Sequence, residues 1–299
     1  MENSDLQNEI AAATNHLIKL NALDELRLED PEFSRHKAEE APDANRYLNV
    51  IPYDHALLPG AYQNASLIPP YSGNRNSASC VASQAPLATT LSQFFEQLHA
   101  QKSKVIVNLT ALEENGIVKS ERYWPLDKET PFISPDGQWT VFLMSDLPAK
   151  DAFDKTQYAE AASLLDLRVR RLKLLSIMGK ERKEHEITQL HFIGWPDHGA
   201  LAPLHLLALI QAVRAVQPSA VPTPIWVHCS AGIGRSGTLI GTLFAQEEPI
   251  LSSTNQSSIE TTANITAHMR KFRPGSVQSV GQFLAMAHAI GSLRSEKGV

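Results

Sequence analysis

A cysteine and an arginine stand six residues apart in a glycine-rich stretch of this chain. Residues 225–237 run Ile-Trp-Val-His-Cys-Ser-Ala-Gly-Ile-Gly-Arg-Ser-Gly and contain Cys229 and Arg235. Glycines relieve the steric limits on a tightly curled backbone, so such a loop directs several amide N–H groups toward one point. An arginine binds two phosphate oxygens at once, and positive surroundings stabilise a thiolate. The spacing therefore predicts a nucleophilic Cys229 at the base of a phosphate-sized anion site.

Two other interpretations of this stretch stay open from the residues alone. A lone cysteine is most often a small buried hydrophobic residue. Residues 232–237 also match the G-x-G-x-x-G pattern of dinucleotide-binding enzymes. That pattern should open a nucleotide-binding unit with an acidic residue after a second strand, whereas the nearest candidate, Glu260, lies in a predicted helix.

The apolar spacing predicts the elements that must position this loop. A short apolar strand over 225–228 enters the loop and a helix over 237–245 leaves it, which brings the positive end of a helix dipole to the anion site. Uneven alternation of strands and helices favours a mixed α/β sheet. Further strands are predicted at 78–82, 104–109, 139–144, 167–175 and 186–193, with a charged turn at 178–185, and further helices at 2–28, 91–101, 204–216, 259–271 and 280–293.

Length and composition fit one soluble globular domain over residues 1–299, with its core at about 16–293. The chain has 43% apolar residues, 20% charged residues and a formal net charge of −5. This acidic excess argues against nucleic acid as a partner, because phosphate-backbone binding needs a basic surface. Two cysteines are too few for a disulfide framework or a structural zinc site. We find no signal peptide, membrane-length apolar run or lipidation motif, which predicts a cytoplasmic protein with no membrane anchor.

Residues 228–238 resemble the signature loop of the tyrosine-specific, non-receptor branch of the protein tyrosine phosphatases. Three further segments are similar to motifs of that family and follow in the same order along the chain. Residues 45–55 resemble its phosphotyrosine loop, 194–199 its Trp-Pro-Asp loop and 273–282 its glutamine loop. The resemblance spans roughly residues 45–290. It implies the phosphatase fold, a single α/β domain with a central twisted mixed β-sheet flanked by helices.

The resemblance implies a two-step hydrolysis of phosphotyrosine. Cys229 would form a cysteinyl-phosphate while Arg235 binds the phosphate, and Asp197 would serve as general acid and then as general base. Gln278 would position the hydrolytic water, with Gln282 assisting. The resemblance also implies that Ser236 and His228 support the thiolate, that Ser230, Ala231, Gly232, Ile233 and Gly234 bind phosphate, and that Trp195 and Pro196 shape the Trp-Pro-Asp loop.

Other matched positions concern the substrate and the rim of the site. Tyr47 would stack on the substrate ring and wall a cleft too deep for phosphoserine. Asn49 stands where the family usually has an aspartate that grips the peptide backbone. Glu114 would pair with Arg235, and Lys119 would pair with the general acid, although a solvated charged hairpin explains Lys119 equally well. Residues 146–166 exceed the usual family length, which predicts an added surface turn and helix.

The resemblance implies a signalling hydrolase that acts on phosphotyrosine-containing proteins, with phosphate or other oxyanions as ligands of the signature loop and no metal or other cofactor. Its thiolate would be sensitive to oxidation. Two other function classes share parts of this pattern. A phosphotyrosine-binding pseudophosphatase would normally lack Cys229, Arg235 or Asp197, which are all present. A phosphatase acting on phosphoserine, phosphothreonine or phosphoinositides would lack the Tyr47 loop or carry lysine in its signature loop.

Overall fold

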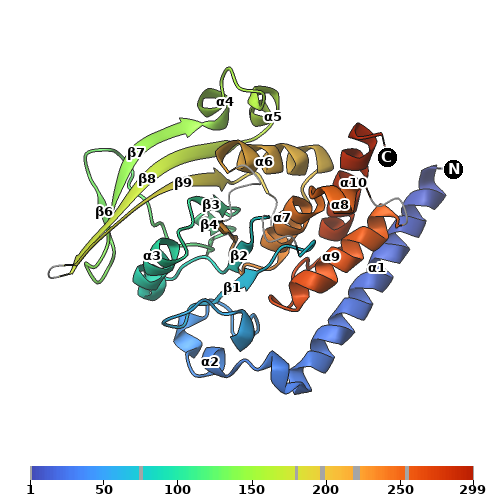
Figure 1. Ribbon diagram of the computed structural model, residues 1–299, viewed down its shortest axis with the longest axis horizontal. Coiled ribbons are helices and arrows are strands. Elements are labelled where there is room, and N and C mark those ends of the chain that lie inside the picture. The colour runs from blue at the N-terminus through green and yellow to red at the C-terminus, as the bar shows by residue number, and fades with distance from the viewer. Residues whose placement is uncertain are drawn as a thin grey trace.

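The computed structural model describes residues 2–73, 77–178, 181–195, 199–217, 223–252 and 256–298. An eight-stranded mixed sheet crosses the molecule and carries helices on both faces (Figure 1). Its strand order is β1-β2-β10-β3-β9-β8-β7-β6. These strands are β1 (Ala65–Ile68), β2 (Cys80–Ser83), β3 (Val105–Asn108), β6 (Phe132–Ile133), β7 (Thr140–Pro148), β8 (Leu167–Met178), β9 (Glu181–Phe192) and β10 (Ile225–His228), while β4 (Glu113–Glu114) and β5 (Ile117–Val118) form a separate hairpin.

The helices gather mainly on one face of this sheet, with α3 on the other (Figure 1). The helices are α1 (Glu2–Leu26), α2 (His36–Glu39), α3 (Leu91–Ala100), α4 (Ala149–Ala152), α5 (Ala159–Ser163), α6 (Pro203–Val216), α7 (Gly234–Ala245), α8 (Glu248–Leu251), α9 (Ser258–Arg270) and α10 (Val280–Glu296). This architecture confirms the predicted fold class.

Strand β10 lies at the centre of the sheet and sets the position of the loop that follows it. It pairs in parallel with β2 on one edge and with β3 on the other, so that His228 lies beside Ser83 and Asn108. All four residues of β10 are buried, as expected for a parallel strand with both faces covered. The carboxyl ends of three neighbouring strands therefore meet where the signature loop begins.

Two apolar clusters hold the faces of the sheet. One cluster joins α1, α6, α7, α9 and α10; every residue of α7 is buried, and its apolar side chains from Leu239 to Ala245 belong to this cluster. The other is rich in aromatic rings and packs Phe94 and Phe95 of α3 against Trp139 and Trp226. Only α8, α9 and α10 follow α7, and no strand follows it among the described residues. A nucleotide-binding βαβ unit cannot form there, so the dinucleotide-binding interpretation is wrong.

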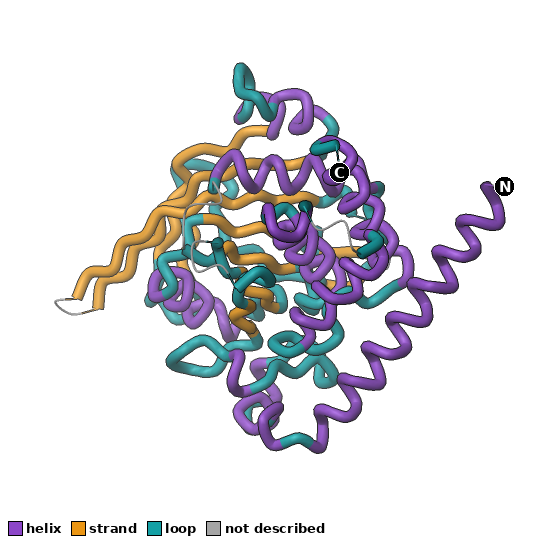
Figure 2. The backbone as a smooth tube through the Cα atoms, turned by 45° about the vertical axis from the view of Figure 1, so that its right-hand side comes forward, coloured by secondary structure: helices purple, strands orange, loops and turns teal. Residues whose placement is uncertain are grey.

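The predicted charged turn at 178–185 is too long: the two strands that it was expected to join do pair in antiparallel, but residues 181–185 belong to β9. Strand β8 continues to Met178 and β9 begins at Glu181, and residues 179–180 between them lie outside the described residues. Figure 2 shows this long ribbon projecting from the body of the molecule. Its charged side chains form cross-strand pairs, with Lys173 Nζ 2.6 Å from a Glu184 oxygen. Charge at these positions marks the solvated faces of a two-stranded ribbon, where opposite charges on facing strands stabilise each other.

The segment 146–166 is more than a surface addition. Its side chains Phe153, Ala162 and Leu165 are buried in the same cluster as α6. The prediction of a surface turn and helix is therefore only half right, because α4 and α5 exist but contribute apolar groups to the core. Strands β1 and β6 were not predicted, since each is short and lacks a clear alternating pattern. Among the residues that the structure describes, no helix combines the length and apolar character needed to cross a membrane.

Candidate active site

The signature loop curls between β10 and the start of α7, with Cys229 at its base. The Gly232 N–H donates to the Cys229 Sγ over 3.2 Å, and the cysteine side chain is buried apart from a small exposed fraction of 5%. Gly232 has φ +73°, and a Cβ there would lie 2.0 Å from the Ser83 carbonyl oxygen. Only glycine fits this position, for its conformation and for its space.

Arg273 holds the loop from behind, although no individual role for it was predicted. Its Nε and Nη2 donate to the carbonyl oxygens of Gly232 and Ala231 over 3.2 and 2.9 Å. Because a trans peptide points its C=O and N–H in opposite directions, the Ala231 carbonyl bond turns the Gly232 N–H toward the sulfur. Burial lowers the pKa of Arg273 to about 10, so it stays charged at neutral pH.

Arg235 is the second residue of α7 and is oriented by Glu114 of the β4–β5 hairpin, as predicted. Its Nη1 and Nη2 donate to the two Glu114 carboxylate oxygens over 2.6 and 2.9 Å. The Nη1 also donates to the Leu109 carbonyl oxygen over 3.1 Å. Thr110 Oγ1 donates to the same carboxylate over 3.0 Å. This bidentate geometry fixes the plane of the guanidinium beside the loop.

His228 is fully buried, and its hydrogen bonds define one neutral tautomer. Its Nδ1 lies 3.2 Å from the Cys229 carbonyl oxygen, which can only accept, so Nδ1 carries the proton. Its Nε2 accepts from the Tyr123 hydroxyl over 2.8 Å. Burial lowers the pKa of His228 to about 3, and the ring is uncharged at neutral pH. Any support that His228 gives the thiolate therefore acts through loop geometry and not through a positive charge.

Ser236 also departs from the expected arrangement. Its Oγ is buried and has no hydrogen-bond partner among the described residues. The expected bond from Ser236 to the Cys229 sulfur is not formed, and the Gly232 amide makes the contact with the sulfur instead.

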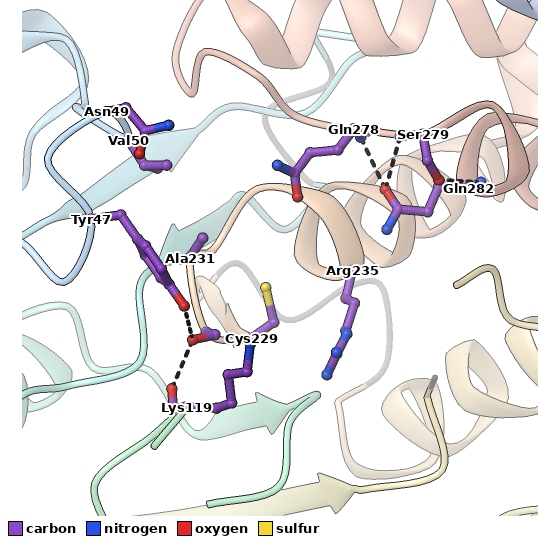
Figure 3. A pocket seen from close by; sticks show the side chains of 11 residues that line it. Tyr47, Asn49, Val50, Lys119, Cys229, Ala231, Arg235, Gln278, Ser279 and Gln282 are labelled. Carbon is purple, nitrogen blue, oxygen red and sulfur yellow. Dashed lines mark hydrogen bonds between the residues drawn. The ribbon is translucent and has the colours of Figure 1, made fainter. Parts of the chain in front are cut away.

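A cavity of about 480 Å³ opens above Cys229 (Figure 3). Tyr47 forms one wall, and its hydroxyl lies 2.8 Å from Ser230 Oγ. Ser230 Oγ donates its own proton to the Lys119 carbonyl oxygen over 2.9 Å, so the tyrosine is the donor of the first bond. Exposed Asn49 also lines the cavity. The remaining lining residues are Val50, Lys119, Ala231, Arg235, Gln278, Ser279 and Gln282.

The glutamine loop forms the opposite wall of the cavity. A Cβ on Gly234 would lie 2.5 Å from Gln278 Oε1, which places that amide directly over the start of α7. Gln282 Oε1 accepts from the Gln278 N–H over 2.9 Å. Gln282 is also the third residue of α10 and forms a reciprocal capping box with Ser279. Gln282 thus ties the loop to its helix.

Part of the Trp-Pro-Asp loop is defined by the structure. Trp195 is buried, and its ring N–H donates to the Gly199 carbonyl oxygen over 3.2 Å. Pro196 and Asp197 lie outside the described residues. The structure thus brings Cys229, Arg235, Tyr47 and Gln278 to one cavity and leaves the general-acid assignment as a prediction.

Sequence reasoning also missed Arg46, which precedes Tyr47. Its Nε and Nη2 donate to the carbonyl oxygens of Ala85 and Pro86 over 3.3 and 2.8 Å. These bonds hold the Tyr47 loop against the end of β2. The position of Arg46 within the phosphotyrosine-loop motif could have suggested this role, whereas the residue type alone could not.

Comparison with known proteins identifies relatives of the whole catalytic region. Residues 41–292 match the family model described as protein-tyrosine phosphatase. Receptor-type tyrosine-protein phosphatase V of Rattus norvegicus is 33% identical over 259 residues, which cover 82% of this chain but 14% of that protein. Tyrosine-protein phosphatase non-receptor type 20 of Rattus norvegicus is 30% identical over 246 residues, 81% of this chain and 52% of that protein.

Solved structures agree with these sequence matches. The catalytic domain of human protein tyrosine phosphatase non-receptor type 18 superposes with a TM-score of 0.77 at 26% identity. The alignment covers 97% of this chain and 98% of that chain. Trypanosoma brucei protein tyrosine phosphatase gives a TM-score of 0.76 at 28% identity, over 96% and 93% of the two chains.

Proposed function

Because the chain belongs to the protein-tyrosine phosphatase family, we propose that it hydrolyses phosphotyrosine in proteins through a cysteinyl-phosphate intermediate. One observation carries the proposal: the Cys229 sulfur lies under a cavity walled by Tyr47, beside an arginine whose guanidinium is already oriented. The match covers 14% of receptor-type phosphatase V and 52% of non-receptor type 20, so the substrates of this chain are argued from the site.

In the first step the substrate phosphate binds to the loop amides and to Arg235. The Cys229 thiolate attacks phosphorus in line, and the bond from phosphorus to the tyrosine oxygen breaks. Asp197 gives its proton to that departing oxygen. Phosphoryl transfer has a loose transition state, so positioning and charge stabilisation supply most of the rate enhancement.

In the second step a water attacks phosphorus while the bond from phosphorus to sulfur breaks. The Gln278 amide orients this water, and Asp197 accepts its proton. Inorganic phosphate leaves and the Cys229 thiolate is restored. The neutral His228 keeps the loop carbonyl of Cys229 in place throughout the cycle.

The depth of the cleft supports selectivity for phosphotyrosine. The Tyr47 hydroxyl bonds to Ser230 inside the loop, so the ring stands as a wall along the full depth from the rim to the phosphate site. A phosphoserine side chain is too short to span that wall. A related enzyme, the non-receptor type 18 phosphatase, has been solved in complex with HER2 phosphopeptides, which supports a peptide substrate for this chain.

The proposal includes three finer features: reversible oxidation of Cys229, a role in signalling and a cytoplasmic location. A thiolate reached from the cavity is the form that peroxide oxidises. Activity lost to peroxide should return with added thiol if this is right, and microscopy of the tagged full-length protein checks the location.

The direct test compares turnover of a phosphotyrosine peptide and a matched phosphoserine peptide with chelator present. We expect strong preference for phosphotyrosine, no turnover by Cys229→Ser, and turnover by Asp197→Ala reduced about 100-fold or more, in the range of a general acid. Cys80→Ser is the matched control. The buried Cys80 thiol has its pKa raised to about 12, so we expect its replacement to leave turnover intact.

Equal turnover of the two peptides would contradict the role of Tyr47 in selection. Tight phosphotyrosine binding without turnover by the wild-type protein would make the chain a binding module.

A further inference from the structure

Side chains of α1 contact the glutamine loop and Arg270, which stands just before it, and α1 lies outside the matched residues 41–292. Asn21 Oδ1 and Asp24 Oδ2 both accept from Arg270 Nη1, over 2.8 and 3.1 Å. Asp24 Oδ2 also accepts from the Gly275 N–H over 3.1 Å. The other Asp24 oxygen accepts from Arg27 over 2.8 Å. Asp24 thus meets the loop directly, about 250 residues away in the sequence, and Asn21 reaches it through Arg270 at the end of α9.

Arg270 connects these α1 residues to the backbone just before Gln278. Its side chain is 1% exposed, and its charge is compensated by Asp24. Its Nε donates to the Ser276 carbonyl oxygen over 2.9 Å, and its Nη2 donates to the Val277 carbonyl oxygen over 3.0 Å. One planar guanidinium therefore meets α1 on one edge and two successive loop carbonyls on the others. The planar fork gives these bonds a fixed direction.

Val277 has an unusual backbone that makes this support necessary. Its φ is +61°, in the left-handed region that β-branched residues rarely adopt. Such a conformation persists only where the surroundings hold it on several sides. Here the Val277 N–H donates to Ile233 of the signature loop over 3.1 Å, and its carbonyl accepts from Arg270. The next residue is Gln278, so the conformation of Val277 decides where that amide points.

We propose that Asn21 and Asp24 are positioning residues for the hydrolysis of the cysteinyl-phosphate. They orient Arg270, Arg270 holds the carbonyls of residues 276 and 277, and that backbone directs Gln278 over the signature loop. This inference rests on the proposed function and deepens it. Neither α1 residue lines the cavity above Cys229 or touches the phosphate site.

The inference makes a kinetic distinction between the two steps. Gln278 acts on water in the second step, so misplacing it slows loss of phosphate from sulfur and leaves release of the phenol unchanged. The ratio kcat/KM reports events up to release of the phenol, whereas kcat falls when the second step becomes slow. A defect confined to the second step therefore lowers kcat and KM together.

The test is rapid-mixing kinetics of Asp24→Ala and Asn21→Ala with 4-nitrophenyl phosphate. We expect a burst of nitrophenol approaching one per active site, then a steady rate lowered about tenfold, with kcat/KM within about twofold of wild type. Acid-quenched samples should hold more phosphorylated enzyme than wild type. If kcat/KM falls in parallel with kcat and no burst appears, or if nothing changes, the inference is wrong.

Glu9→Gln is the matched control on the same helix. Glu9 pairs with His288 of α10 over 2.9 Å and has no contact with the loop, so we expect no burst and an unchanged steady rate. If the Asp24→Ala protein fails to fold, the same kinetics are measured with Asp24→Asn, which keeps the size of the side chain and removes its charge. A wild-type protein inactive on phosphotyrosine would overturn the proposed function. An active wild type with unaltered variants would overturn only the positioning role.

Discussion

At the scale of single residues, Arg235 meets the Glu114 carboxylate through two short hydrogen bonds, and Thr110 fixes the same carboxylate from another side. The guanidinium is therefore oriented before any ligand arrives, and ligand binding need not order it. Charge-assisted bonds of this kind each contribute about 1.5–3 kcal/mol.

Glu114→Gln should lower kcat/KM on a phosphotyrosine peptide by about 10- to 100-fold, because a neutral amide loses the charge-assisted bidentate contact with Arg235. Steady-state kinetics measure this, and phosphate inhibition should weaken in the same variant. Glu113→Gln is the control, since Glu113 is the exposed neighbour on the same strand. Equal activity of the two variants would show that Arg235 needs no support from Glu114.

Motif spacing predicted the residues that meet in the cavity, and it could not predict what holds them. Cys229 and Arg235 are six residues apart, so local spacing carries their relation. Arg273 bonds to carbonyl groups about 40 residues away, and Asp24 bonds to Arg270 and Gly275 about 250 residues away. Every residue type offers backbone carbonyl groups, and all but proline offer an N–H group. The residue types in a sequence therefore do not reveal which distant backbone group an arginine or aspartate side chain will bond to.

At the scale of elements, the buried strands and long helices were predicted within a few residues because their apolar periodicity is continuous. The outer part of the β8–β9 ribbon was mispredicted because its run of charged residues suggested a solvated turn. In the structure these side chains form ion pairs from one strand to the other. The segment 146–166 was mispredicted because its few apolar residues lie scattered among charged ones. The fold shows that they converge on α6.

Phe153 tests that correction, because it belongs to the added segment and is only 5% exposed. Phe153→Ala should lower the free energy of unfolding by about 3 kcal/mol or more, the usual cost of deleting a buried aromatic ring. Urea unfolding followed by fluorescence measures this. Leu164→Ala, at an exposed position of the same segment, should change stability by less than about 0.5 kcal/mol. If both substitutions lowered the free energy of unfolding by a similarly small amount, residues 146–166 would be a surface addition, as the sequence predicted.

At the scale of the whole molecule, buried neutral histidines make stability depend on pH. Burial lowers the pKa of His228 to about 3 and that of His191 to about 4, below the ordinary value of 6.5. Below pH 6.5 these two histidines therefore become protonated in the unfolded chain while they stay neutral in the folded chain. Stability present at neutral pH is lost as the pH falls toward the two folded values.

Each of these two histidines should cost about 2 kcal/mol of unfolding free energy between pH 6.5 and pH 5. Urea unfolding at pH 7, 6 and 5 measures this loss together with that from His185 and His268, whose pKa values burial also lowers. His191→Gln removes one titrating ring, so its stability should fall less steeply with acidification than that of wild type. Wild-type protein equally stable at pH 7 and pH 5 would contradict the neutral assignments.

The burial of β10 between two parallel neighbours has a consequence for how the molecule opens in solution. Its amide hydrogens exchange with heavy water only when the centre of the sheet separates, which requires nearly the full free energy of unfolding. The ion pair of Glu9 with His288, whose side chains are each 44% exposed, lies nearer the surface and opens at lower cost. The first turns of α1, whose residues 4–8 are exposed, can thus open and close many times while the strand beneath the phosphate site keeps its hydrogens.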